Sequence, residues 1–327
     1  MTVKRALFVL VCLALVAWSV FSRERPVSQR DTPPLPAALG SAASTTALAT
    51  DRFPTAKGDL VVSPLEHASV LFGWDGRAFY VDPTSPAIAD EALPRADVIF
   101  VTEDRSDHLD AVALGRLSRP GTIVVGPPAV AEKVHVDVVL QNGDTREVLG
   151  VVATAVPMYN VERGPAPGLR YHDKGRGNGY VLDFGGTRVY LSGDTDCTPE
   201  MMALRQIDAA FVSLSAPTAM TPAEAVRCLE AFQPKVVFPY HDRRVDLSAV
   251  ESGLRGSGMD LREREFYPRA EHWRADALAA CAEGHFGVCR DHLDMAKALD
   301  PLGEADPRVV HAREQVRAWQ SPFPAWW

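Results

Sequence analysis

The stretch IFVTEDRSDHLD, residues 99–110, is the part of this 327-residue chain around which the rest is organised. Its apolar start is typical of the end of a buried strand, and the helical spacing of AVALGRL directly after it predicts a helix. Asp107, His108 and Asp110 therefore lie in a loop between a strand and a helix. Because two acids and a histidine are costly to bury unless they bind something, this loop is the first candidate for a functional site.

Other chemically active residues also stand at the ends of predicted strands. Asp194 directly follows the apolar strand of VYLSGDTD, His241 ends KVVFPYH, and Asn160 and His172 enclose a polar stretch between them. Taken singly, an acid after glycine usually makes a turn and a histidine at a strand end is usually structural. Together they form a series that spans more than 130 residues: an acid and a histidine at 107 and 108, an acid at 194 and a histidine at 241. Such a series is typical of a metal site assembled from distant loops.

The stretch TEDRSDHLD resembles the metal-binding signature T-H-x-H-x-D-H of the metallo-β-lactamase superfamily, with Glu103 and Arg105 where the signature has its first two histidines. The similarity covers about residues 60–267 and continues through EHASV, VPMYN, YHDKGRGNGYVLDFGGTRVYLSGDTDCTPEM, IDAAFVSLS and MTPAEAVRCLEAFQPKVVFPYH. These stretches are similar to a bacterial group related to ascorbate-6-phosphate lactonases and N-acylphosphatidylethanolamine phospholipase D. The resemblance implies an α+β fold, a four-layer αβ/βα sandwich, and metal-dependent hydrolysis.

The resemblance also implies a set of ligands. The family site holds two metals, and the ligands of the second would be Asp107, His108, the bridging Asp194 and His241. The third-histidine position of the first metal falls at Asn160 or at His172, which is the only histidine nearby. Asp107 and Asp194 are the expected catalytic residues. The residues expected to support the ligands rather than bind are His67, Tyr240 and Asp242.

Two substitutions in the signature change what the first metal pocket can hold. Arg105 would put its guanidinium where the charge of the first metal would be and pair with Asp194. Alternatively Glu103 would be a ligand, since carboxylate oxygen binds zinc. Either arrangement predicts one divalent ion, Zn²⁺ or else Mn²⁺. Hydrolysis then requires an open coordination position, because a closed tetrahedral site is structural.

Composition excludes some classes of function. The chain is 46% hydrophobic and 23% charged, as expected for a globular protein with a sizeable core. Its formal net charge of −8 argues against nucleic-acid binding, which needs clustered Lys and Arg. The five cysteines show no C-x-x-C spacing, so a metal would be held by histidine and carboxylate.

Four parts are predicted along the chain. Residues 1–25, where two basic residues precede the apolar run ALFVLVCLALVAWSVF, predict a signal anchor or transmembrane segment, with cleaved export as the alternative. Either would place the main domain outside the cytoplasm, in the periplasm or its equivalent. Residues 26–57, rich in Pro, Ala, Ser and Thr, predict a flexible linker. The metallo-β-lactamase-like domain is expected at residues 58–268 and a helical extension at residues 269–327.

Two local patterns inside the main domain predict particular elements. GYVLDFGGTRVYLSGDTD predicts a hairpin of two alternating strands around Gly185 and Gly186. In TPAEAVRCLEAF, Thr221 as N-cap, Pro222 at the first helical position and Glu224 three residues after the cap predict the start of a helix.

The extension has the spacing of a tetratricopeptide repeat. The positions that match are Trp273, Ala277, Ala280, Leu293, Ala296 and Pro301. One repeat cannot bury its own face, so a helical hairpin plus a third helix is expected to pack on the main domain or on a protein partner. A plain helical extension is the alternative. Cys281 and Cys289 face each other across this hairpin, as a disulfide or as buried thiols.

Two functions follow from these features. One is a hydrolase of small-molecule or lipid-like esters, lactones, amides or phosphodiesters. The other is a membrane-tethered pseudoenzyme that keeps the fold for binding, with the helical end as its contact surface. A spacer for an interaction module is a weaker third interpretation, since the resemblance spans nearly the whole main domain.

Overall fold

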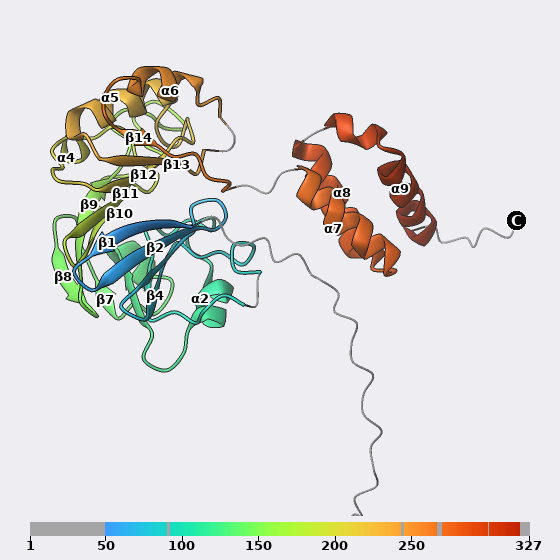
Figure 1. Cartoon of the computed structure of the whole chain (residues 1–327), viewed down its shortest axis with the longest axis horizontal. Coiled ribbons are helices and arrows are strands. Elements are labelled where there is room, and N and C mark those ends of the chain that lie inside the picture. The colour runs from blue at the N-terminus through green and yellow to red at the C-terminus, as the bar shows by residue number, and fades with distance from the viewer. Residues whose placement is uncertain (1–49, 90–91, 243–244, 267–269, 300, 321–327) are drawn as a thin grey trace, which may run out of the picture. The chain divides into compact units, whose positions relative to one another are not determined.

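The structure is a computed structural model that describes residues 50–89, 92–242, 245–266, 270–299 and 301–320. In these residues the chain forms two seven-stranded mixed sheets that face each other (Figure 1). A continuous apolar core lies between them and takes Phe72, Phe79 and Val98 from one sheet and Phe184 and Phe211 from the other. The predicted signal anchor at residues 1–25 lies outside the described residues.

The first sheet runs antiparallel from β1 to β4 and parallel from β4 to β7. Its strands are β1 (Asp51–Thr55), β2 (Gly58–Pro64), β3 (Val70–Trp74), β4 (Arg77–Val81), β5 (Val98–Phe100), β6 (Ile123–Gly126) and β7 (Val138–Val139). The linker predicted to extend to residue 57 is wrong at its end, because β1 pairs with β2 there. Phe53 is buried, and Arg262 and Arg264 bind the buried carboxylate of Asp51, so this segment gains both apolar and ionic contacts.

The second sheet mirrors this arrangement, antiparallel from β8 to β11 and parallel from β11 to β14. Its strands are β8 (Thr145–Val148), β9 (Val151–Met158), β10 (Gly177–Phe184), β11 (Thr187–Leu191), β12 (Ala209–Ser213), β13 (Val236–Tyr240) and β14 (Asp260–Leu261). The predicted hairpin around Gly185 and Gly186 is confirmed, since both have the positive φ that its turn requires.

Helices cover the outer face of each sheet (Figure 1). On the first sheet these are α2 (Ala111–Leu117) and α3 (Pro128–Ala131), and on the second α4 (Pro199–Met202), α5 (Pro222–Phe232) and α6 (Ser248–Leu254). Each set buries its own apolar cluster against its sheet, so the layers run helix, sheet, sheet, helix. This order of layers is the one that the family resemblance implies for residues 58–268.

The C-terminal helices have a core of their own. They are α7 (Ala270–Ala282), α8 (Phe286–Leu299), the 3₁₀ turn η1 (Pro301–Ala305) and α9 (Pro307–Gln320). Ala277, Leu293 and Val309 are among the buried residues that join them. A helical hairpin plus a third helix is therefore confirmed, whereas the tetratricopeptide identity stays a prediction. Among the described residues, no helix is both long enough and apolar enough to cross a bilayer.

Four of the five cysteines form disulfides. One joins Cys281 at the end of α7 to Cys289 in α8, with a Cα–Cα distance of 5.2 Å, and settles the choice between disulfide and buried thiols. The other joins Cys197, in the loop after β11, to Cys228 in α5, with a Cα–Cα distance of 5.5 Å. The second bond was not predicted, because only the fold brings two cysteines 31 residues apart into contact.

The N-terminus of α5 offers a simple test of the fold. Thr221 Oγ1 accepts from the backbone N–H of Glu224, and the Glu224 carboxylate accepts from the backbone N–H of Thr221, as the sequence predicts. We expect Thr221→Ala to lower the free energy of unfolding by about 1 kcal/mol, because the backbone N–H of Glu224 loses the hydroxyl oxygen that accepts from it. Chemical denaturation measures this change, and an unaltered midpoint with an unaltered slope would contradict it.

Candidate metal centre

The loops that follow the strands bring the predicted polar residues together. Glu103, Asp107 and His108 lie in the loop after β5, Asp194 lies in the loop after β11, and His241 directly follows β13. Because neighbouring parallel strands end at the same edge of a sheet, loops far apart in the sequence meet there. Seven side chains at this edge form two groups, and within each group the potential ligand atoms all lie within 4.8 Å of one another.

The first group consists of His67, Asp107, His108 and His241. Asp107 Oδ2 lies 3.5 Å from His67 Nε2 and 3.7 Å from His241 Nε2. The His241 ring stacks on that of His108 with centroids 5.1 Å apart. His67, which the sequence interpretation places in a supporting role, thus offers a ligand atom of its own, because the turn between β2 and β3 points its ring at Asp107.

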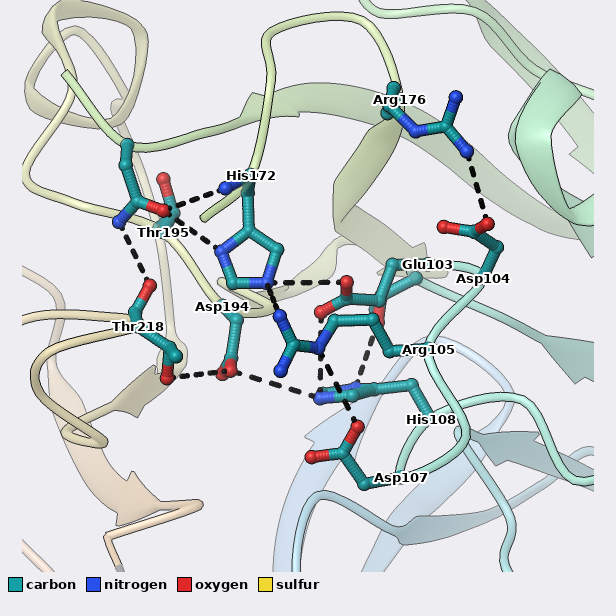
Figure 2. A network of polar contacts seen from close by, with 12 residues as sticks. Glu103, Asp104, Arg105, Asp107, His108, His172, Arg176, Asp194, Thr195 and Thr218 are labelled. Atoms are coloured by element: carbon teal, nitrogen blue, oxygen red, sulfur yellow. Dashed lines mark hydrogen bonds and ion pairs between the residues drawn. The ribbon is translucent and has the colours of Figure 1, made fainter. Parts of the chain in front are cut away.

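The second group consists of Glu103, His172 and Asp194, all buried (Figure 2). Glu103 Oε2 lies 3.3 Å from His172 Nε2, and Glu103 Oε1 lies 3.6 Å from His108 Nε2. The pocket of the first metal, expected to be emptied by the loss of two histidines, therefore keeps three ligand atoms. Glu103 is among them, as one of the two alternatives for that residue requires.

Asp194 joins the two groups. Its Oδ1 lies 3.5 Å from His241 Nδ1 and its Oδ2 lies 4.0 Å from His108 Nε2. Ser213 Oγ donates a hydrogen bond of 2.8 Å to Oδ1, which holds the carboxylate in place. Tyr240 supports the same loop, since its hydroxyl oxygen accepts from the backbone N–H of Gly193. The convergence of Asp107, His108, Asp194 and His241 predicted from the sequence is therefore present.

The buried atoms of these groups fit a cation better than they fit one another. Among the described residues, Glu103 Oε1, His108 Nε2 and both ring nitrogens of His241 are buried without a hydrogen-bond partner. Such atoms cost free energy unless something satisfies them. Ligand atoms about 2.0–2.1 Å from a tetrahedral ion lie about 3.3 Å apart, which is close to the separations observed here. Imidazole and carboxylate are also the donor set that zinc takes.

Asp82 orients His108 and was missed by sequence analysis. It follows β4 and accepts from the Thr102 hydroxyl at 2.6 Å and the Thr102 backbone N–H at 2.7 Å. His108 Nδ1 lies 2.8 Å from Asp82 Oδ2, which leaves His108 Nε2 directed into the site. A carboxylate behind a ligand histidine is the usual support of a metal centre. The available signal was an acid directly after a buried strand in YVDPT, the same signal that identified Asp194.

The backbone around the site is unusual. Three of its residues have positive φ without being glycine: His67 at 60°, Asp82 at 44° and His241 at 50°. Such conformations cost about 1–3 kcal/mol each and persist where the surroundings hold them, often at functional sites. No pattern in the sequence predicts them.

The electrostatics favour positive charge in the site. Burial by itself lowers the pKa of His108, but the carboxylates of Glu103 and Asp82 outweigh it and raise the pKa to about 10. Burial raises the pKa of Asp194, but the imidazoles of His241 and His108 outweigh it and leave the pKa below its ordinary value. The imidazoles of His241 and His67 hold the pKa of Asp107 far below its ordinary value. Asp107 and Asp194 therefore remain ionised, as ligands must be, whereas His108 has to give up a proton when it binds a cation.

His172, rather than Asn160, faces the ligand groups. Its Nε2 points at Glu103, while Asn160 Oδ1 lies 3.0 Å from its Nδ1 and accepts from its backbone N–H at 2.9 Å. Arg105 also departs from the prediction that pairs it with Asp194. Among the residues that the structure describes, its carboxylate partner is Asp107, at 3.8 Å.

Comparisons with known proteins agree with this geometry. A family model described as "Beta-lactamase superfamily domain" matches residues 62–241, which include every residue of both groups. The UPF0173 metal-dependent hydrolase of Methanosarcina mazei is 28% identical over 202 residues, 58% of this chain and 86% of that protein. The one from Thermus thermophilus is 30% identical over 188 residues, 54% of this chain and 81% of that protein.

Solved structures lead to the same family. A proposed metal-dependent hydrolase of Parabacteroides distasonis is 34% identical and superposes with a TM-score of 0.64. The match covers 67% of this chain and 100% of that one. A metallo hydrolase of Ignicoccus hospitalis, 16% identical with a TM-score of 0.52, shares the fold. The chain therefore belongs to the β-lactamase superfamily, among the metal-dependent hydrolases that have the metallo-β-lactamase fold.

Proposed function

We propose that this protein hydrolyses its substrate with one divalent cation held by His67, Asp107, His108 and His241, next to Asp194. The observation that supports this most directly is the set of buried, unpartnered ligand atoms of His108 and His241 that face carboxylates. Three imidazoles and a carboxylate favour Zn²⁺, with Mn²⁺ as the alternative. Of the residues predicted as ligands, His172 then belongs to the neighbouring group.

Each carboxylate has its own part in the reaction. A divalent cation bound here would polarise the scissile bond and make water nucleophilic near neutral pH. Asp107 is 31% exposed, so its carboxylate reaches the open side of the site, where it would accept a hydrogen bond from the attacking water and orient it. Asp194 is buried against Ser213 and stays charged, and this charge holds the rings of His108 and His241 in position.

The substrate class proposed is a small-molecule or lipid-like ester, lactone, amide or phosphodiester. All four contain a carbonyl or phosphoryl centre that water attacks, and the family membership of the chain supports hydrolysis of such a bond. Of the three acids in the two ligand groups, Glu103 and Asp194 are buried and Asp107 is partly exposed. We therefore place the approach of the substrate on the side of Asp107.

We also propose that the protein is membrane-anchored through residues 1–25, with the main domain outside the cytoplasm. The two disulfides support this location, because disulfides persist in oxidising compartments and are rare in the cytosol. The helical extension, with the tetratricopeptide-like spacing of Trp273 and Leu293, is proposed as the surface for a protein partner.

A pseudoenzyme is the second candidate. The observation that favours it is the presence of Glu103 and Arg105 where the signature has imidazoles, since this change removes two neutral ligands from the site. Such a protein would keep the fold and the ligand groups without turnover. Activity measurements on metal-loaded protein separate the two candidates.

Removing and restoring the cation tests the proposed function. After treatment with a chelator, we expect saturation with Zn²⁺ to raise Tm by about 5 °C or more, because ligand at a hundredfold above Kd adds about 2.7 kcal/mol. Hydrolysis of a p-nitrophenyl ester or of bis-p-nitrophenyl phosphate is expected to return with the metal. Scanning fluorimetry and absorbance measure the two effects. Protein that binds no ion and stays inactive with Zn²⁺ and Mn²⁺ would overturn the hydrolase proposal.

A further inference from the structure

Arg105 lies between the two ligand groups and contacts one residue of each (Figure 2). Its Nε is 3.8 Å from Asp107 Oδ1, whereas the other carboxylate oxygen, Oδ2, faces His67 and His241. Its Nη1 is 3.5 Å from His172 Nε2. A guanidinium therefore stands beside the very atom through which His172 would bind a cation.

The state of His172 explains why a positive charge is needed there. The amide of Asn160 has a fixed orientation, because its Nδ2 donates to Asp196 Oδ1 at 2.9 Å and to the Thr218 carbonyl at 2.8 Å. Its Oδ1 can then only accept, so His172 Nδ1 carries a proton and faces it. His172 Nε2 is left facing Glu103 Oε2 at 3.3 Å. A lone pair opposed to a carboxylate is repelled unless a positive charge stands between or beside them.

The acids of this group need the same compensation. Glu103 and Asp194 are both buried, and buried carboxylates are costly without a partner charge. His172 faces Glu103 Oε2 at 3.3 Å and Ser213 donates to Asp194, but Glu103 Oε1 is buried without a hydrogen-bond partner. The hydrogen bonds of the group therefore compensate its two acids only in part. Arginine does not lose its proton in proteins, which makes it a permanent source of charge.

Other basic residues around the site are bound to other acids. Arg176 and Lys133 both pair with Asp104, at 3.0 and 2.8 Å. Arg163 pairs with Glu224 at 3.0 Å and also with Asp196. Arg105 differs from these in making its contacts with residues of the ligand groups.

We propose that the guanidinium of Arg105 is the resident cation of the Glu103–His172–Asp194 group, so that this group does not take a second divalent ion. The inference deepens the proposed function, because it sets the number of ions at the centre. The carboxylates of Asp82, Glu103, Asp107 and Asp194 carry four negative charges, and one divalent ion together with one arginine would offset three of them. A second ion would have to enter beside a fixed positive charge, and the repulsion would weaken its binding.

Counting bound ions tests this assignment on the full chain. Metal-free protein is titrated with Zn²⁺ by calorimetry, and the ions retained after desalting are measured by mass spectrometry. We expect Arg105→Gln to bind one ion per chain more than the wild type, with at least about tenfold higher affinity at that site than the wild type has there. The matched control is Arg176→Gln, which removes an exposed arginine from the neighbouring loop and is expected to keep the wild-type count.

A second variant locates the added ion. Combining Arg105→Gln with Glu103→Gln, which keeps the side-chain shape, is expected to return the count to that of the wild type. Thermal unfolding of each variant shows whether it is folded. An Arg105→Gln protein that is folded and gains no ion overturns the inference, as does a gained ion that survives Glu103→Gln. The proposed function is judged separately, by whether the wild type binds an ion and is active with it.

Discussion

Asp194→Asn is expected to reduce kcat/KM for any substrate by at least about a hundredfold and to weaken binding of the catalytic cation by a similar factor. Replacing a residue that supports a metal ligand typically costs about 10–100-fold in metal affinity, and Asp194 would support two ligands at once. Its two oxygens face His241 and His108 at 3.5 and 4.0 Å. Asparagine keeps the shape and the contact with Ser213 but loses the charge. Steady-state kinetics and zinc titration measure the two effects.

Asp183→Asn is a suitable control for this variant. Asp183 closes the β10–β11 hairpin by accepting from the backbone N–H of Gly186, and it lies in neither ligand group. We expect this change to leave the activity and the cation affinity at wild-type values. If Asp194→Asn is folded and retains activity within a fewfold of the wild type, Asp194 is not part of the chemistry and the proposed mechanism is wrong.

Asp82→Asn is expected to weaken cation binding by about 10–100-fold although Asp82 does not face the cation. Both of its oxygens accept from donors, one from the Thr102 backbone and the other from the Thr102 hydroxyl, with His108 Nδ1 close to the latter. Asparagine offers one accepting oxygen and one donating NH₂, so a buried donor loses its acceptor. This loss costs about 1–3 kcal/mol of stability. Calorimetry with Zn²⁺ and chemical denaturation measure the two quantities.

The choice of asparagine at position 82 removes a backbone effect. Asp82 has φ of 44°, a conformation that asparagine tolerates and alanine does not. Thr102→Val serves as the comparison, because it removes one hydroxyl contact to Asp82 and leaves His108 opposite the carboxylate. We expect it to change cation affinity less than Asp82→Asn does. Equal effects of the two variants would mean that Asp82 acts through packing rather than by orienting His108.

Local signals predicted the elements with strong patterns of their own. The hairpin at Gly185 and Gly186 and the capping box at Thr221 were predicted because a few adjacent residues decide them. β8 and α6 were not predicted, since the short run TREV and the helix SAVESGL lack a strong periodic pattern. β1 was assigned to the linker because residues 26–57 as a whole are rich in Pro, Ala, Ser and Thr. Only the partners Arg262 and Arg264, more than two hundred residues away, make its Asp51 favourable to bury.

The site follows the same division. The sequence by itself determined most of the strands and helices, because their patterns are properties of short segments, and the family resemblance implied the types of ligand. Only the tertiary structure decided that His67 joins Asp107, that His172 rather than Asn160 faces Glu103, and that Arg105 stands between the two ligand groups. These facts are distances between residues from separate loops. The packing of both sheets sets such distances, and no segment read alone contains them.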